Sequence, residues 1–275
     1  MESKPIIFTD LDGTLLDHQT YSFTAALPAL DLVKQREIPL ILCSSKTRAE
    51  IESWRKRLDN LHPFIAENGG GIFIPHSYFL ENDLATVWSK KIRIDEYCIL
   101  ILGTPYPQLR GVLEELKRDG FGIKGFGDMD AAEVAEVTRL SLEEARLAKQ
   151  REFDEPFVFN GGQKELSKLL ASIEEKGLQY TQGMFYHLLG DNDKGKAVEI
   201  LKKLYKKKFG NIFTIALGDS PLDLPMLLEV DYPIIVKNFK GEYNRKVVLP
   251  NFIRADGIGP EGWNKAVLKV IQEML

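Results

Sequence analysis

The sequence predicts an α/β fold in which a doubly wound, Rossmann-like parallel sheet carries an inserted α+β domain. Short apolar runs that end in polar residues or glycine alternate with longer amphipathic stretches, which is typical of parallel α/β sheets. The pattern changes between about residues 84 and 190 and then resumes, which indicates an insertion. We therefore expect a core built from residues 1–83 and 191–275, with residues 84–190 forming a second domain.

The first part of the core begins with the apolar run Pro5–Thr9, which predicts the first strand. Two amphipathic stretches then predict helices, and the second follows Ser44 and Ser45, which can cap its first turn. The segment Glu67–Gly70 suits a turn with positive φ and separates two short strands. After the first strand we expect helix 24–37, strand 38–43, helix 46–58, strand 64–66 and strand 71–74.

The middle of the chain interleaves apolar runs with charged helical stretches, which predicts a smaller α+β domain. One of its helices opens with Ser141 and has Glu144 three residues later, the spacing of a capping box. We expect helices at 107–119, 130–138, 141–152 and 164–176. The apolar runs of this domain lie at 97–102, 121–126, 156–159 and 184–189.

The core pattern resumes at Lys194, where amphipathic and apolar stretches again alternate. This return indicates that the second domain interrupts the first rather than following it. The elements expected here are helix 194–208, strand 212–217, helix 222–228 and strand 232–236.

The composition excludes several classes of protein. Lys and Arg number 36 against 40 Asp and Glu, a formal net charge of −4, so the positive charge typical of nucleic-acid binding is missing. Cys43 and Cys98 are too few for a disulfide framework or a cysteine metal cluster, which favours a reducing compartment. No apolar run approaches the roughly 20 residues that span a bilayer. We expect a cytoplasmic protein with no nucleic-acid or membrane partner.

Two carboxylates follow the first predicted strand directly, in the segment Asp10-Leu11-Asp12-Gly13-Thr14. Ligands of α/β sheets bind at the carboxyl ends of parallel strands. Asp10 can act there as a nucleophile or metal ligand, and Asp12 as a general acid and base. A turn that merely closes the strand explains the same residues, because Asp and Gly are also favoured in turns.

A second carboxylate pair, Asp219 and Asp223, follows the expected strand 212–217. Mg²⁺ prefers oxygen ligands in octahedral geometry, so carboxylates from two strand ends can hold it. The alternative is that Asp219 caps a helix and Asp223 lies on the surface. Two acidic strand ends in one chain favour the Mg²⁺ site.

Two further segments suit a phosphate group. Ser44 and Ser45 follow strand 38–43 and offer hydroxyl and backbone N–H groups at a helix N-terminus, which binds anions. Lys194 follows the insertion and can place its ammonium on a phosphoryl oxygen. The plain alternatives are a helix cap for Ser44 and a solvated side chain for Lys194.

Taken in order, these strand-end motifs resemble those of the haloacid-dehalogenase-like phosphohydrolase superfamily. The resemblance implies that Asp10 forms a phosphoaspartyl enzyme, and that Asp12 protonates the leaving group and then deprotonates water. It implies Mg²⁺ as the cofactor, held by Asp10, Asp219 and the carbonyl of Asp12, with Asp223 in support. The insertion resembles the class-two α+β cap domain of the sugar-phosphatase branch, and the turn at Asn68 also matches that branch.

The segment from Thr138 to Phe157 resembles the cap segment of mannosyl-3-phosphoglycerate phosphatases. The resemblance implies that this segment faces the active site and recognises the glycosyl and glycerate parts of the substrate. Arg binds carboxylates bidentately, and Gln and Glu can bind sugar hydroxyls. The alternative is an ordinary amphipathic helix end. The substrate-binding residues expected on this basis are Asn68, Gln150, Arg151 and Glu155.

We therefore expect a Mg²⁺-dependent phosphatase that hydrolyses mannosyl-3-phosphoglycerate, a small phosphorylated sugar, to mannosylglycerate and phosphate. Three alternatives stay open: a phosphatase of glucosyl-3-phosphoglycerate or another sugar phosphate, a phosphomannomutase-like phosphotransferase, and a non-catalytic phosphosugar-binding module. A pure binder needs no nucleophile or proton shuttle, so the binding module is disfavoured by the joint presence of Asp10, Asp12, Lys194, Asp219 and Asp223.

Overall fold

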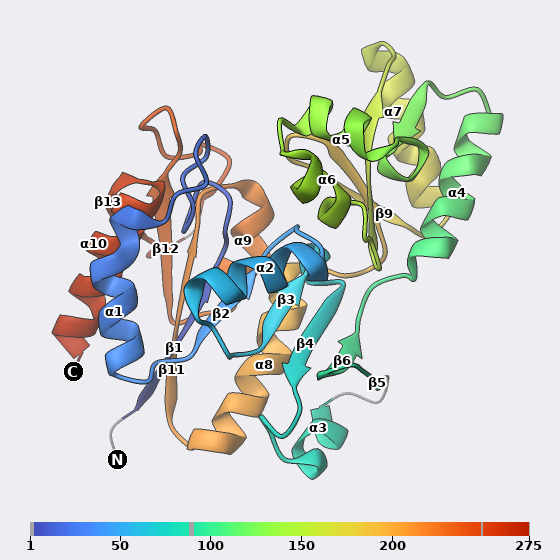
Figure 1. Ribbon diagram of the computed structural model, residues 1–275. Helices are drawn as coiled ribbons and strands as arrows, with labels where there is room; N and C mark the ends of the chain where they lie inside the picture. Colours follow the sequence, from blue (N-terminus) through green and yellow to red (C-terminus); the bar gives the residue numbers. More distant parts are fainter. Residues whose placement is uncertain (1–2, 88–90, 249, 275) are drawn as a thin grey trace.

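The computed structural model describes residues 3–87, 91–248 and 250–274. Its core is a nine-stranded sheet with the order β13-β12-β11-β1-β2-β3-β4-β6-β5, and the inserted domain forms a separate lobe with its own four-stranded sheet (Figure 1). The core strands are β1 (Lys4–Thr9), β2 (Leu40–Cys43), β3 (Phe64–Ala66), β4 (Gly71–Pro75), β5 (Lys91–Ile94), β6 (Tyr97–Ile101), β11 (Ile212–Gly218), β12 (Tyr232–Lys237) and β13 (Ile253–Ile258).

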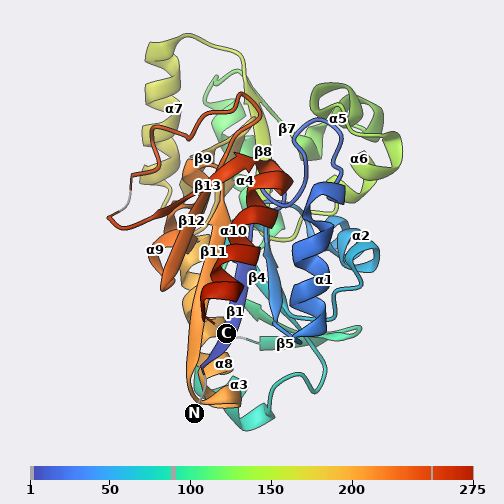
Figure 2. The ribbon, with the colours of Figure 1, turned by 90° about the vertical axis from the view of Figure 1, so that its left-hand side faces the viewer.

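Helices cover both faces of the core sheet, which makes the central strands apolar on both sides (Figures 1 and 2). Ile7 of β1 packs on one face, whereas its neighbours Ile6 and Phe8 pack on the other. The first face is covered by α1 (Leu27–Gln35), α2 (Arg48–Leu58) and α10 (Gly259–Met274). The second face is covered by α3 (Glu81–Val87), α8 (Lys194–Phe209) and α9 (Leu224–Leu228).

The strands at the centre of the sheet are parallel, and this arrangement positions the site. β1 pairs in parallel with β2 on one side and with β11 on the other. The segments that follow these three strands therefore leave the sheet at the same edge. They begin with Asp10, Ser44 and Asp219, respectively.

The far end of the sheet departs from the predicted parallel arrangement. β4, β6 and β5 are antiparallel to their neighbours, so the sheet is mixed. β6 was expected in the inserted domain, but its buried residues Cys98 to Leu100 extend the core sheet beside β4. The predicted start of the insertion at residue 84 is therefore wrong, since α3 and β6 both pack in the core. We infer an insertion that begins after Ile101 and ends between Leu189 and Lys194.

The inserted domain, referred to below as the cap, is an antiparallel sheet with helices on both faces. Its strand order is β7-β8-β10-β9, from β7 (Ile123–Gly125), β8 (Asp154–Phe159), β9 (Gln179–Gln182) and β10 (Tyr186–Leu189). Phe157 packs against α4 (Tyr106–Arg118) and α7 (Gln163–Glu175). Val158, one residue later, contacts the other cluster, with α5 (Ala131–Thr138) and α6 (Leu142–Ala148).

One of the two helix caps predicted from the sequence is present in the structure, and the other is not. Ser141 and Glu144 form the expected capping box of α6, although that helix ends at Ala148 instead of continuing to Glu152. Ser44 and Ser45 do not cap α2, which begins two residues later than expected. Thr47 is its cap, because its Oγ1 accepts the N–H of Glu50 while the Glu50 carboxylate accepts the N–H of Thr47.

Several elements, among them β9, β13 and α10, were not predicted from the sequence. β9 has exposed Gln179 and Gln182 at its ends and two half-buried residues, Tyr180 and Thr181, between them, so no apolar run marks it. β13 and α10 lie in the last part of the chain, for which no element was predicted. Within the described ranges, no helix combines the length and the apolar character needed to cross a membrane.

Candidate active site

The end of β1 places Asp10 at the centre of the sheet edge. Its backbone N–H donates to Leu217 O of β11 at 3.0 Å, which continues the pairing of the two strands. The preceding Thr9 is braced from the C-terminal helix, because Trp263 Nε1 donates to Thr9 Oγ1 at 3.0 Å. Asp10 is buried and lines a cavity between the core and the cap. The backbone of this carboxylate is therefore fixed before any ligand binds.

Gly13 lets the chain turn beside this carboxylate. Its φ of 79° lies in the left-handed region, and a Cβ atom there would lie 2.9 Å from Asp219 Oδ2. The turn brings Asp12 to the cavity as well. Asp12 Oδ1 makes no hydrogen bond among the described residues, whereas Oδ2 forms an ion pair. One oxygen of Asp12 is thus available to a ligand.

The end of β11 supplies the second carboxylate pair, and its two members differ. Asp223 is fully buried, and its Oδ2 accepts hydrogen bonds from the backbone N–H groups of Asp219 and Ser220 and from the Ser220 hydroxyl. Asp219 lines the cavity. Asp223 therefore holds the loop, and Asp219 is the member of the pair that faces a ligand.

Lys194 joins the two strand ends. Its Nζ lies 2.7 Å from Asp10 Oδ1 and 2.7 Å from Asp223 Oδ1, and the residue is only 2% exposed. Burial lowers the pKa of Lys194, but the charges of Asp10 and Asp223 outweigh this and hold its pKa well above the ordinary value. The lysine is therefore a fixed positive charge beneath the site.

The carboxylates outnumber this lysine, and their arrangement fits a metal ion. Asp10, Asp219 and Asp223 each offer one oxygen, and these atoms lie within 4.8 Å of one another. Burial, followed by the charge of Asp223, raises the pKa of Asp10 to about 7. Burial, followed by the charges of Asp223 and Asp10, raises the pKa of Asp219 well above its usual range. A bound divalent cation would relieve this repulsion, and oxygen-only ligands suit a hard cation.

Lys46 is a residue of the site that sequence reasoning missed. It lies just after β2, is buried, and its Nζ is 3.0 Å from Asp12 Oδ2. It also lies 3.6 Å from Glu50 Oε1. Its position directly after Ser44 and Ser45 was the available signal. Lys46 thus fixes one oxygen of the carboxylate predicted to move protons.

The cavity measures about 570 Å³ and is lined by both domains. The core contributes Asp10, Asp12, Lys194 and Asp219, and the cap contributes Arg151 and His187. The structure thus brings the sequence-predicted carboxylates and Lys194 together with one predicted cap residue.

Of the predicted residues Ser44, Ser45 and Asn68, only Ser45 lines the cavity. Ser45 lines the cavity, whereas Ser44 is 1% exposed and its Oγ accepts the N–H of Lys46 at 3.2 Å. Asn68 is buried and does not line the cavity. Its backbone N–H donates to Ser44 O at 3.1 Å, and its Nδ2 donates to Asp154 Oδ2 at 2.9 Å. Asn68 therefore links the core strand end to the cap.

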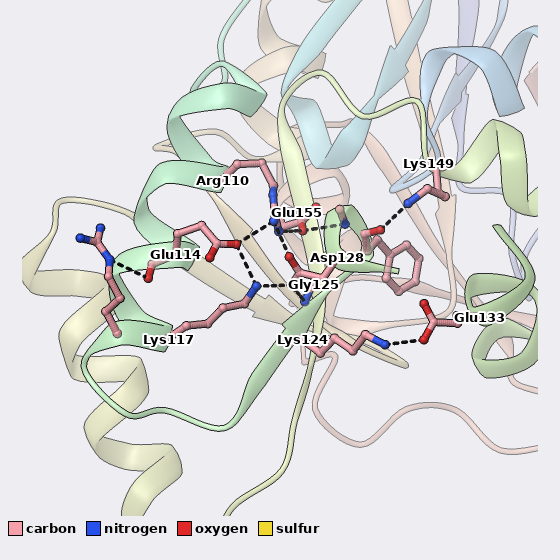
Figure 3. A network of polar contacts seen from close by, with 12 residues as sticks. Arg110, Glu114, Lys117, Lys124, Gly125, Asp128, Glu133, Lys149 and Glu155 are labelled. Carbon is pink, nitrogen blue, oxygen red and sulfur yellow. Dashed lines mark hydrogen bonds and ion pairs between the residues drawn. The ribbon is translucent and has the colours of Figure 1, made fainter. Parts of the chain in front are cut away.

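The other two predicted cap residues do not line the cavity. Gln150 is exposed outside it. Glu155 is fully buried inside the cap, where Arg110 Nη1 donates to its Oε1 at 2.7 Å and Gly127 N–H donates to the same atom at 3.0 Å. Figure 3 shows this contact as part of a network with Asp128, which also accepts from Arg110. Glu155 holds the cap together in this arrangement instead of contacting the cavity.

Glu67 joins the core to the cap through backbone hydrogen bonds. The residue is fully buried in the turn between β3 and β4. Its carboxylate accepts the N–H of Glu152 at 2.9 Å and the N–H of Phe153 at 2.7 Å. Burial raises the pKa of Glu67 from 4.5 to about 8.

This contact predicts a pH-dependent stability. Because the folded pKa of Glu67 exceeds the unfolded value, the native state holds this proton more tightly, and stability falls as the pH rises from 4.5 to about 8. Glu67→Gln removes the titration while keeping one acceptor oxygen. We expect the variant to gain several degrees in melting temperature relative to wild type between about pH 5 and about pH 8. A difference that stays constant with pH would contradict the assignment.

The comparisons with known proteins agree with this geometry. The family model of haloacid dehalogenase-like hydrolases matches residues 7–92, which include Asp10, Asp12 and Ser44. A solved structure from Thermoplasma acidophilum has a TM-score of 0.69 at 17% identity, covering 99% of this chain and 100% of that chain. The α/β core with an inserted cap is therefore a known fold.

This fold and its strand-end carboxylates define the chain as a haloacid dehalogenase-like hydrolase. Two relatives have names that state their substrates. The glucosyl-3-phosphoglycerate/mannosyl-3-phosphoglycerate phosphatase of Methanococcoides burtonii is 49% identical over 271 residues, 98% of this chain and 97% of the relative. Its namesake from Persephonella marina is 42% identical over 275 residues, 98% of each chain. The chain belongs to this phosphatase family and is a phosphoric monoester hydrolase, which confirms the family predicted from the sequence.

Proposed function

We propose that this phosphatase hydrolyses mannosyl-3-phosphoglycerate to mannosylglycerate and phosphate, and that it accepts the glucosyl analogue. The observation that carries the proposal is the 49% identity, over 98% of the chain, to a relative named for both substrates. The cavity supports it, because its core side holds carboxylates and a lysine suited to a phosphate and its cap side holds Arg151.

In the proposed first step, Asp10 attacks the phosphorus in line. Lys194 holds Oδ1 of Asp10, which leaves the other carboxylate oxygen for the attack. The new bond joins Asp10 to phosphorus, and the bond from phosphorus to the glycerate oxygen breaks with its electron pair. Asp12 gives its proton to this leaving oxygen.

In the proposed second step, Asp12 accepts a proton from water, and the resulting hydroxide attacks phosphorus. The bond from phosphorus to Asp10 then breaks, which frees phosphate and restores the carboxylate. Lys46 is paired with Oδ2 of Asp12, so Oδ1 is the oxygen available to carry the proton. Asp12 changes its protonation state twice in each cycle.

Mg²⁺ is the proposed cofactor, with Asp10, Asp219 and the Asp12 carbonyl as its ligands and Asp223 behind them. When bound, the ion supplies charge neutralisation for the phosphoryl oxygens. Ser45 and Lys194 offer the remaining polar groups, while Ser44 supports the loop through its bond to Lys46.

The test is phosphate release in Mg²⁺ and in EDTA, measured for mannosyl-3-phosphoglycerate, glucosyl-3-phosphoglycerate, 3-phosphoglycerate, mannose 1-phosphate and mannose 6-phosphate. We expect the two glycosyl-3-phosphoglycerates to exceed the simple phosphates by about 100-fold or more in kcat/KM. EDTA should abolish release, and added Mg²⁺ should restore it. A preference for simple sugar phosphates would overturn the proposed substrate, and full activity in EDTA would overturn the proposed cofactor.

A further inference from the structure

One strand end at the edge of the site has no role in the proposed mechanism. β12 pairs in parallel with β11, so the segment that follows β12 leaves the sheet at the edge where the carboxylates of the site lie. This segment, residues 238–247, lies beside the loop after β1, because the rings of His18 and Phe239 stack with 4.4 Å between their centroids (Figure 1). It also reaches the cavity, since Asn244 and Lys246 both line it.

The backbone of this loop is fixed by its own bonds. Val247 is buried in the core, and the Tyr243 hydroxyl donates to Ala255 O at 2.8 Å. Asn244 Oδ1 accepts the N–H of Lys246 at 3.1 Å, and Asn244 O accepts the N–H of Val247 at 3.0 Å. Oδ1 of Asn244 is therefore committed to the loop, while its Nδ2 donates to none of the described residues. The loop thus offers the cavity two donor groups, the amide of Asn244 and the ammonium of Lys246.

Lys246 differs from the other cations of the cavity in its exposure and in its lack of a counter-ion. Lys46 and Lys194 are buried and paired with carboxylates at 3.0 Å and 2.7 Å, respectively. Arg151 is half-buried and donates to two backbone carbonyls. Lys246 is exposed, and within the described ranges no ion pair joins it to a carboxylate. It is therefore a free positive charge where the cavity opens to solvent.

A positive charge at the opening matters because the wall behind it is acidic. Four carboxylates line the cavity, and its buried lysines are already paired with two of them; the four are Asp10, Asp12, Glu50 and Asp219. The proposed substrate carries a phosphate and a carboxylate, so it approaches as a multiply charged anion. A cation at the entrance offsets the repulsion and raises the concentration of the anion there, an effect that salt screens.

We propose that Lys246, with Asn244 on the same loop, is an entry site that captures the anionic substrate by charge before the phosphate reaches Asp10. This inference rests on the proposed function and deepens it, because it adds a binding site on a core loop to a cavity otherwise described by its strand-end carboxylates and its cap. The ammonium of Lys246 attracts the anion, and the amide of Asn244 donates a hydrogen bond to it. The entry site acts on capture of the substrate and not on the chemical step.

The experiment measures kcat and KM for mannosyl-3-phosphoglycerate at about 20 mM and about 500 mM KCl, with Mg²⁺ held constant. Lys246→Gln should lower kcat/KM about fivefold at low salt and less than about twofold at high salt, because salt screens the lost charge. The loss should lie in KM with kcat unchanged, since this lysine does not touch the reacting atoms. Lys246→Glu should give a larger loss, and Lys246→Arg should keep most of the wild-type value.

Two further variants separate charge at the cavity from loop structure and from net charge. Asn244→Asp keeps the acceptor for the N–H of Lys246 and replaces the amide donors with a negative charge, so it should also lower kcat/KM at low salt. Lys269→Gln is the matched control, because Lys269 lies on α10 away from the cavity in an exposed ion pair with Glu273. It removes the same charge and should leave kcat/KM unchanged at both salt concentrations.

The outcomes separate this inference from the proposed function. An equal loss in Lys246→Gln at low and high salt, or a loss confined to kcat, would overturn capture by charge. An unchanged kcat/KM at low salt would overturn the role of Lys246. If wild type hydrolysed p-nitrophenyl phosphate but not mannosyl-3-phosphoglycerate, the proposed substrate would fall, whereas a salt-dependent loss in Lys246→Gln with p-nitrophenyl phosphate would still support the entry site.

Discussion

We expect Asp10→Asn to abolish phosphate release, with a fall in kcat of about 10⁴-fold or more. The amide is a poor nucleophile, so the phosphoaspartyl intermediate cannot form. Backbone bonds to Leu217 and the brace from Trp263 through Thr9 do not involve this side chain, so the fold should survive. The measurement is phosphate release from mannosyl-3-phosphoglycerate with Mg²⁺ in excess.

The stability of the same variant separates catalysis from folding. Asn removes one charge from a cluster in which burial and the charge of Asp223 already raise the pKa of Asp10 to about 7. Thermal unfolding in EDTA should therefore occur at a temperature no lower than for wild type. Asp256→Asn, at an exposed ion pair with Lys237, is the control and should retain activity. Substantial turnover by Asp10→Asn would refute the assignment of the nucleophile.

The core of this site was predictable because it depends on local patterns. An apolar strand followed at once by a carboxylate marks the carboxyl end of a buried strand, as at Asp10 and Asp219. Parallel pairing of β1 with β11 then brings the two segments together. The presence of Lys194 at the site could be predicted from its position at the start of a helix that packs on the same sheet.

The cap wall was not predictable in the same way, because its contacts join segments far apart in the chain. His187 has an ordinary strand sequence around it, and its partner Asp154 lies 33 residues earlier. Glu155 follows Asp154 directly, yet it is turned into the cap and held by Arg110. Adjacent residues of a strand point to opposite faces, so resemblance to a family segment could not decide which of the two acids contacts a residue of the cavity wall.

The predicted start of the insertion was wrong for a related reason. The run at Tyr97–Ile101 is apolar and short, which fits a buried strand in either domain. The strand joins the core because it pairs with β4. Without β6, that edge of β4 would have no neighbouring strand to bond with. Strand pairing of this kind is set by tertiary contacts and leaves no mark in the local pattern.

Lys194→Met should have the second largest effect, on both stability and activity. The substitution leaves the buried carboxylates of Asp10 and Asp223 without the ammonium that now lies 2.7 Å from each. Breaking a buried pair in this way costs about 3–5 kcal/mol, so we expect a large loss of stability in EDTA. Loss of a fixed charge at the phosphate should also lower kcat by about 10²–10³-fold.

Adding Mg²⁺ tests the origin of that instability. If Asp10 and Asp219 hold the ion with Asp223 behind them, its charge replaces part of the missing ammonium, and the melting temperature of Lys194→Met should rise more on adding Mg²⁺ than that of wild type. Lys196→Met, two residues along α8 at an exposed ion pair with Asp191, is the matched control and should behave as wild type. An equal rise in Lys194→Met and wild type would argue against an ion at these carboxylates, because the variant has more uncompensated negative charge there to stabilise.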